Sequence, residues 1–420
     1  MQEKLYISAV PDSVGEAEWT APKTKALSMR MTGFFLIAQM AGAGFLALPR
    51  ATADTGWLGT IMMPLFCCSV AFIGTRLGKS WVILEERWPE VYKGAVRQPY
   101  MDISERSLGK VGRNITLWCV VLNLFGTTNV HLILISEMLA AVVQTEAGAC
   151  FTKCHALIIV AACLIPLTWL GSPKDFWQAS ILAVVTTAAA VLVIVVQIFL
   201  EEDLPTPTYP NPTVNDMADR SQFWKSVIIG FTGILSLYLP VALVGYIKLG
   251  DSVESNVIMS VSMTPVVIAA IAMEIVNLMC TFLISSNTVY QSTEELLNVP
   301  RRFGPARCIV RAVIVVLQVI IGLAVPNFGK ILNLIGGSLI TLCTFVLPPV
   351  MYMRLVGDKS NENWKKRTMP LWEKIYLIEI IIVGIIGGIL ATVIAVYDVI
   401  AASFAGNCFT EFNSCPLIDQ

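Results

Sequence analysis

The sequence has few charged residues for its length. They make up 14% of the chain, whereas hydrophobic residues reach 55% and the mean hydropathy is +0.70. Typical soluble proteins have about 25% charged residues, and much of their surface must face water. A soluble protein of 420 residues could not hide this much apolar surface. The composition therefore excludes soluble, disordered and coiled-coil classes and indicates a multi-pass membrane protein.

Several chemistries lack the residues that they need. The net charge is −1 and the chain has 2 histidines, so neither a basic field for nucleic acid nor a histidine metal site is expected. The 11 cysteines include no CxxC pair. The phosphate-loop pattern GxxxxGK[ST] and the catalytic patterns HExxH and GxSxG are also absent. The sequence thus predicts no enzyme, no resident cofactor or metal, no ATP-driven pump and no nucleic-acid partner.

Long apolar runs are what the sequence has instead. A helix needs about 20 apolar residues to cross a hydrocarbon core of about 30 Å, and runs of this length can satisfy their backbone groups in lipid only as helices. The sequence predicts about ten spans of this length. They are 32–53, 58–80, 115–143, 155–171, 177–200, 226–247, 265–288, 308–326, 331–353 and 375–401. We therefore predict an all-α protein with a cytoplasmic tail over 1–30, a membrane domain over 31–402 and an outward-facing tail over 403–420.

Basic residues predict the orientation of these spans. Lys and Arg gather in the N-terminal tail, in the loop after the second span and in the loops 290–307 and 354–374, which the positive-inside rule assigns to the cytoplasm. With ten spans, however, the last two of these loops would face outward. An eleventh span within 201–225 would repair every assignment, but this stretch is too polar to span. Two interpretations stay open, a weakly specified topology or a helix missing at Val214/Asn215.

Two motifs carry a resemblance to a known family. The first is Gly42-Ala43-Gly44-Phe45-Leu46-Ala47-Leu48-Pro49-Arg50 followed by Gly56-Trp57, and the second is Tyr238-Leu239-Pro240-Val241-Ala242-Leu243-Val244-Gly245-Tyr246 followed by Gly250-Asp251-Ser252-Val253. They resemble the first and the seventh helix of the amino acid/auxin permease family, and the likeness runs from about residue 28 to 400. The resemblance implies the inverted-repeat fold of the bacterial leucine transporter, and amino acid transport driven by protons or sodium.

The resemblance also bears on the number of spans. Members of the family typically have about 11 spans, against about 10 here, and their sixth helix precedes a segment like Phe223-Trp224-Lys225. This chain has that segment and lacks the helix. The resemblance therefore implies a splice or gene-model variant from which about 25 residues, enough for one span, are missing.

Small residues in the first span predict a substrate site. Inverted-repeat transporters bind substrate near the bilayer midplane, where helices are broken. Ala41, Gly42, Ala43 and Gly44 can supply such a break, and Phe45 can contact the substrate side chain. The alternative is close helix packing by small residues. Asn123, in the third span, is expected to face the same cavity, and the partner broken helix would be the missing sixth.

Polar residues in the seventh predicted span suggest ion coupling. Glu274 lies near the middle of that span and Asn277 lies one turn later. An ionisable group costs roughly several kcal/mol in hydrocarbon, so it is a functional candidate. Ser285 and Ser286 offer oxygen atoms that suit sodium. A hydrogen-bonded structural carboxyl and plain helix contacts stay open as alternatives, and no residue selects proton over sodium.

The predicted function is secondary active transport of an amino acid across a plasma, endolysosomal or vesicular membrane. The partners are the amino acid and the lipid bilayer, and the oligomeric state is not predicted. The alternative is a non-transporting variant that lacks the sixth helix and acts by association or is degraded.

Cysteines on predicted outer segments allow disulfides of undetermined pairing; these are Cys150, Cys154, Cys408 and Cys415. The amphipathic stretch 101–110 is expected at the inner membrane surface.

Overall fold

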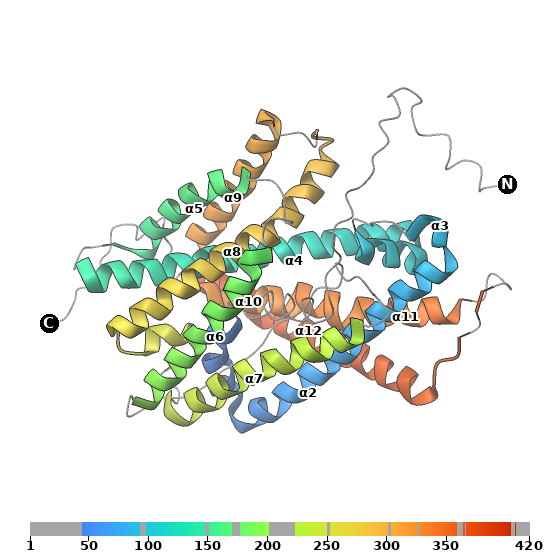
Figure 1. Cartoon of the computed structure of the whole chain (residues 1–420), viewed down its shortest axis with the longest axis horizontal. Helices are drawn as coiled ribbons and strands as arrows, with labels where there is room; N and C mark the ends of the chain where they lie inside the picture. Colours follow the sequence, from blue (N-terminus) through green and yellow to red (C-terminus); the bar gives the residue numbers. More distant parts are fainter. Residues whose placement is uncertain are drawn as a thin grey trace.

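The chain is described by a computed structural model. It covers residues 44–92, 98–147, 151–169, 177–200, 223–249, 253–300, 304–325, 327–358, 364–365, 367–404 and 408. Within these residues every regular element is helical (Figure 1). The elements are α2 (Gly44–Arg87), α3 (Pro89–Tyr92), α4 (Pro99–Ala147), α5 (Lys153–Trp169), α6 (Trp177–Leu200), α7 (Phe223–Leu249), η5 (Val257–Ser260), α8 (Pro265–Leu296), α9 (Pro305–Ala324), α10 (Phe328–Ile335), η6 (Gly336–Ile340), η7 (Leu342–Val346), α11 (Leu347–Gly357) and α12 (Leu371–Phe404).

The helices have the length and composition of membrane spans. Among the described residues, 6 helices are long and apolar enough to cross a membrane, and shorter apolar helices lie at Lys153–Trp169, Val185–Ile198 and Phe231–Gly245. Isoleucine, leucine and valine side chains cover the outside of α12, where lipid rather than water can solvate them. The prediction of an all-α multi-pass membrane protein is confirmed.

Two glycines break long helices. Gly56 in α2 has φ 62° and Gly109 in α4 has φ 77°, a region that glycine enters without steric cost. α2 therefore consists of a short first segment that ends near Gly56 and a second segment that returns to Arg87. Residues 99–108 form a separate short helix before the membrane part of α4. The boundary predicted between 53 and 58 coincides with the break at Gly56.

A disulfide bond defines one face of the bundle. Cys154, at the start of α5, is bonded to Cys408, which follows α12. The backbone N–H of Cys408 also donates to the carbonyl oxygen of Leu323 at the end of α9, over 3.0 Å. The start of α5 and the ends of α9 and α12 thus share one face, called here the disulfide face. Cys150 and Cys415 lie outside the described residues.

Polar contacts define the opposite face. The carbonyl oxygen of Thr168, at the end of α5, accepts a hydrogen bond from Nη1 of Arg311 near the start of α9, over 2.5 Å. Arg87, at the end of α2, is 3.7 Å from the carboxylate of Asp358, which follows α11. Described basic residues of three predicted cytoplasmic loops therefore lie on one face, including Arg307 at the start of α9.

α6 and α7 run in the same direction through the bundle (Figure 1). α6 begins just after α5 has reached the opposite face, and its 24 residues, at about 1.5 Å each, are enough to cross to the disulfide face. α7 also ends at the disulfide face, because Val253 just beyond it accepts a hydrogen bond from Arg50, close to the break at Gly56. The two ends that residues 201–222 must join therefore lie on opposite faces. The missing-helix hypothesis concerns residues outside those that the structure describes.

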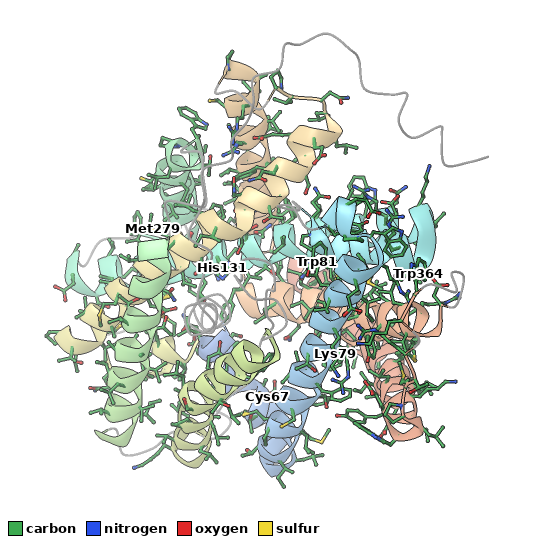
Figure 2. All side chains as sticks on the ribbon, turned by 45° about the vertical axis from the view of Figure 1, so that its right-hand side comes forward. Cys67, Lys79, Trp81, His131, Met279 and Trp364 are labelled. Atoms are coloured by element: carbon green, nitrogen blue, oxygen red, sulfur yellow. A yellow bond between two sulfur atoms is a disulfide. The ribbon has the colours of Figure 1, made fainter. Side chains whose placement is uncertain are left out.

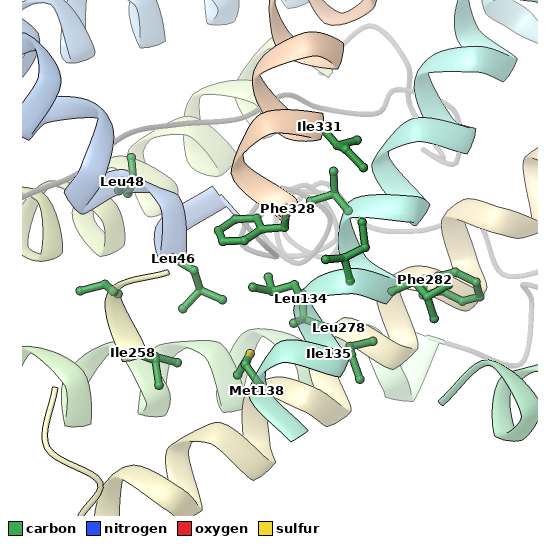
Figure 3. Packing of buried hydrophobic residues seen from close by; sticks show 14 of the residues in the cluster. Leu46, Leu48, Leu134, Ile135, Met138, Ile258, Leu278, Phe282, Phe328 and Ile331 are labelled. Atoms are coloured by element: carbon green, nitrogen blue, oxygen red, sulfur yellow. The ribbon is translucent and has the colours of Figure 1, made fainter. Parts of the chain in front are cut away.

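Buried hydrophobic side chains from several helices form the centre of the bundle. Leu46 of α2, Leu134 of α4 and Phe328 of α10 belong to one cluster and lie close together in Figure 3. Each is at most 1% exposed. Burial of such side chains stabilises the packed state by dispersion contacts, which remain available in lipid. This packing fixes the first segment of α2 against the middle of α4.

The short helix before Gly109 packs on protein. Met101 and Ile103 are 5% and 2% exposed, and the hydroxyl of Tyr100 donates to the carbonyl oxygen of Cys343 over 2.7 Å. Its apolar side is covered by the bundle, because α2 and α11 offer a buried cluster there that includes Trp81. The expectation that 101–110 lies at the inner membrane surface stays a prediction.

Candidate functional site

A large cavity lies between the helices of the bundle, and its lining includes exposed side chains of α2 and α12, among them Leu58 and Val383. Its volume is about 1600 Å³, and its walls come from α2, α4, α8, the segment from α10 to α11, and α12. The lining extends from Arg50 and Asp398 near the disulfide face to Trp81 and Gln291 near the opposite face. A cavity that reaches towards both faces is the kind of space in which a solute could be held during passage.

The structure brings three of the predicted site residues to this cavity. Gly44 of α2, Asn123 of α4 and Ser285 of α8 all line it. Phe45 lies in α2, but its side chain is outside the described part. Ala41, Gly42 and Ala43 lie outside the described residues, so the predicted break is seen only from Gly44 onward.

Glu274 and Asn277 lie between α8 and α6, and neither is among the residues that line the cavity. Glu274 is completely buried. Its carboxylate accepts hydrogen bonds from the amide of Asn277 over 3.0 Å and from the hydroxyl of Thr187 over 3.4 Å. The Asn277 amide also donates to the Thr187 hydroxyl over 2.7 Å. Close packing of α6 on α8 thus encloses three side chains that hydrogen-bond to one another, while Oδ1 of Asn277 is buried without a partner among the described residues.

Along α8, the cavity lining begins one turn after Asn277. The hydroxyl of Thr281 donates to the carbonyl oxygen of Asn277 over 3.0 Å, and Thr281 itself lines the cavity. Ser285 lies one turn further on the same wall. Ser286 is 1% exposed and faces away from the cavity lining. Of the two serines predicted as ion ligands, Ser285 alone is therefore placed at the cavity.

Charge in the described lining is confined to one end. Its charged residues are Arg50, Asp54, Lys330 and Asp398. Arg50 and Asp54 pair at 3.0 Å near the break in α2, Lys330 begins α10 and Asp398 is near the end of α12, so all four lie towards the disulfide face. Further in, the polar lining is made of hydroxyls, amides and one imidazole.

The wall from α10 to α11 contains two π-helical tracts, η6 and η7. Wide turns of this kind free carbonyl oxygens and are common at functional sites. Here the hydroxyl of Thr341 donates to the carbonyl oxygen of Gly336 over 2.7 Å, and Tyr100 donates to that of Cys343. The tract therefore has its own local hydrogen bonds and a link to the helix before Gly109.

Sequence reasoning missed two cavity residues on α4. Thr127 and His131 follow Asn123 at intervals of four residues, and all three line the cavity. His131 is 4% exposed, and its Nδ1 atom has no hydrogen-bond partner among the described residues. Figure 2 shows it in the middle of the bundle. The four-residue spacing could have grouped His131 with Asn123.

No cluster of three or more His, Cys, Asp and Glu side chains suited to a metal ion occurs in the described ranges. The cavity wall instead offers oxygen and nitrogen atoms of neutral side chains, which can bind a polar organic solute or share in binding a monovalent cation.

Comparison with known proteins identifies the family. The sequence model of the family described as transmembrane amino acid transporter protein matches residues 25–210 and 211–397. The chain belongs to this family. Its relatives are transporters rather than enzymes, as predicted.

Named relatives come from Arabidopsis thaliana. The amino acid transporter AVT1B is 26% identical over 359 residues, with 76% of this chain and 63% of that protein covered. The amino acid transporter AVT1J is 23% identical over 433 residues, with 95% and 97% covered. The chain thus spans less than two thirds of AVT1B and nearly all of AVT1J. Among solved structures, a manganese transporter of Eremococcus coleocola matches with a TM-score of 0.47 and 13% identity, covering 97% of both chains.

Proposed function

We propose that the chain is a secondary active transporter that moves amino acids across a membrane, coupled to protons or sodium. The observation that carries this proposal is the cavity between the helices of the bundle, which brings Gly44, Asn123 and Ser285 together in a chain of the amino acid transporter family. Lining residues occur near both faces, so that a solute held between them could be reached from either face in turn as the helices rock.

Glu274 is the proposed site of proton coupling. It is completely buried, accepts a hydrogen bond from Asn277, and lies about two turns along α8 from Thr281, which lines the cavity. Burying a charged carboxylate in apolar surroundings costs free energy, so the neutral form is favoured there. Binding and release of the proton can therefore be coupled to a change in the conformation of the bundle. If sodium is the coupling ion, the oxygen of Ser285 in the cavity wall is the proposed ligand.

Uptake by the purified chain in liposomes tests the proposal. A mixture of radiolabelled amino acids is supplied under an inward proton gradient, an inward sodium gradient or neither. We expect accumulation under one of the two gradients. Gly44→Trp should abolish it by filling the cavity, whereas Gly357→Trp, at a position with open space outside the lining, should not. Absence of accumulation under every gradient would overturn the proposal.

A second candidate function is favoured by the parallel course of α6 and α7. Ten spans leave no helix to join the disulfide-face end of α6 to the opposite-face start of α7. Two further observations support an absent segment. The family match is divided between residues 210 and 211, and the alignment to AVT1J has 433 positions, more than the 420 residues of this chain. We propose as the alternative a non-transporting variant that acts by association or is degraded.

Restoring a helix separates the two candidates. An apolar helix of about 25 residues, long enough for one span, is inserted between Val214 and Asn215. If the alternative holds, the chain as written is scarce and inactive in cells, and the insertion raises its steady-state amount. Equal amounts and equal uptake with and without the insertion would rule the alternative out.

A further inference from the structure

His131 is one of two cavity-lining residues, with Asn123, that have a buried polar atom without a hydrogen-bond partner among the described residues. It belongs to α4 and is 4% exposed. Its Nδ1 atom is buried without a hydrogen-bond partner among the described residues, although the residue lines the cavity. A buried polar atom without a partner is destabilising, because it has lost its hydrogen bonds to water. A ligand in the cavity can supply the missing partner.

His131 lies at the depth of the predicted substrate site. It precedes Leu134 by about one turn, and Leu134 packs beside Leu46 of α2 (Figure 3). Gly44, which lines the cavity two residues before Leu46, is therefore at a similar depth. An amino acid whose backbone groups are held near Gly44 would place its side chain within reach of the α4 wall.

The surroundings of His131 select the chemistry of that side chain. The charged residues of the described lining all lie towards the disulfide face, and Thr127, one turn from His131, adds a hydroxyl. A charged substrate side chain would find no opposite charge at this depth within the described lining. An aliphatic one would leave the imidazole without a partner. A neutral side chain that donates or accepts hydrogen bonds satisfies both conditions.

We propose that His131 is a specificity-determining residue, and that the cavity takes amino acids with a neutral hydrogen-bonding side chain, a carboxamide or a hydroxyl. This rests on the proposed function and deepens it. The imidazole acts by contact with the substrate side chain, so that an amino acid with an aliphatic side chain of similar size binds less tightly.

Equilibrium binding to the purified full chain tests this inference, with L-[³H]glutamine and L-[³H]leucine as probes. We expect the wild type to prefer glutamine. His131→Phe keeps a ring but removes its nitrogens, and should weaken glutamine binding about tenfold, the effect of one buried hydrogen bond, while leucine binding holds or improves. His131→Gln should recover part of the preference. His155→Phe is the matched control, since His155 lies at the start of α5 outside the cavity lining, with Nδ1 2.7 Å from the hydroxyl of Thr152.

The ratio of the two affinities is the decisive quantity, because partial misfolding of a preparation does not change it. Equal affinity of the wild type for the two probes would overturn the substrate class. An equal loss for both probes in His131→Phe would show a structural role and overturn the inference, while leaving amino acid binding in place. If the wild type binds neither probe, the proposed function is overturned, and this inference with it.

Discussion

Arg311 is a buried charged residue whose guanidinium is paired inside the bundle. Its side chain is 1% exposed. Its guanidinium donates to the carboxylate of Glu294 over 2.7 Å and to the carbonyl oxygen of Thr168 over 2.5 Å, and it lies 5.2 Å from the ring centroid of Tyr290. One arginine of α9 thus holds the ends of α5 and α8. The guanidinium suits this role because its donors are arranged in a fixed, planar fork.

Replacing Arg311 should destabilise the chain strongly. Arg311→Leu leaves the carboxylate of Glu294 and the carbonyl of Thr168 with fewer partners, and removing one member of a buried ion pair costs about 3–5 kcal/mol. Arg307→Leu is the control, because its side chain is more exposed (16%) and it meets the same carboxylate at a longer distance, 3.2 Å. Thermal unfolding in detergent should show a much larger fall in Tm for Arg311→Leu. Equal falls would contradict this account.

Glu274 allows a sharper prediction about coupling. Glu274→Gln keeps the size of the side chain and can still bond to Asn277 and Thr187, but it cannot carry and release a proton. If protons drive transport, substrate binding and exchange should persist, whereas accumulation under a proton gradient should fall to the level without a gradient. Thr187→Val, which removes one hydrogen-bond donor to the carboxylate, serves as the comparison and should weaken accumulation without abolishing it. Full gradient-driven accumulation by Glu274→Gln would refute the assignment.

At the scale of elements, α12 packs unusually close to the π-helical wall of the cavity. A Cβ atom on Gly388 would come within 3.0 Å of the carbonyl oxygen of Gly337, and one on Gly384 within 2.8 Å of Cβ of Phe345. A Cβ atom on Gly387 would meet nothing within 4 Å. Small residues at four-residue spacing permit this approach, as they do between many membrane helices.

Substitutions at neighbouring glycines should therefore differ. Gly388→Val forces α12 away from Gly337, and overpacking of this kind costs about 1–3 kcal/mol. Gly387→Val meets open space and should change stability little. Both variants place valine on the same helix, so the effect of the substitution on helix propensity is the same in the two. The measurement is the Tm of each purified variant in detergent, and a comparable decrease for the two would show that close packing is not the cause.

At the scale of the whole molecule, the disulfide fixes the relation between the two halves of the chain. Cys154 follows α4, and Cys408 follows α12. Both must reach the same oxidising compartment, so Cys408 lies on the side of the membrane where α5 begins. Ten spans after a cytoplasmic N-terminus would bring the chain back to the cytoplasmic side. Because the disulfide holds Cys408 on the other side, two successive helices must run in the same direction, and these are α6 and α7.

The position of the C-terminus tests this arrangement directly. A tag after Gln420 should be accessible from the same side of sealed vesicles as a tag placed in the 148–150 loop. Cys154→Ser should free one thiol on that side, seen as one added maleimide label on Cys408 relative to the unreduced wild type. A C-terminal tag on the other side would show that the second half is inverted and that the cavity cannot form as described.

Sequence patterns alone determined the class of this protein and the course of most spans. Apolar runs predict helices because backbone groups in lipid must be satisfied within the helix, and this requirement is local. The break near Gly56 was predictable for the same reason, since the two runs flanking it are short enough to end there. The motif from Gly42 to Arg50 was enough to suggest the family. The distribution of Lys and Arg among the loops indicated that a span is missing near Val214.

Tertiary structure decided which polar groups meet. No pattern in the sequence predicts that Thr187 of α6 bonds to Glu274, because Thr187 is an ordinary residue of an apolar helix until the two helices pack. His131 became a candidate through its burial beside the cavity, and Cys154 found Cys408 across 254 residues. Contacts between distant segments depend on helix rotation and depth in the bundle. These are set jointly by the packing of every helix, whereas a span is set by its own residues.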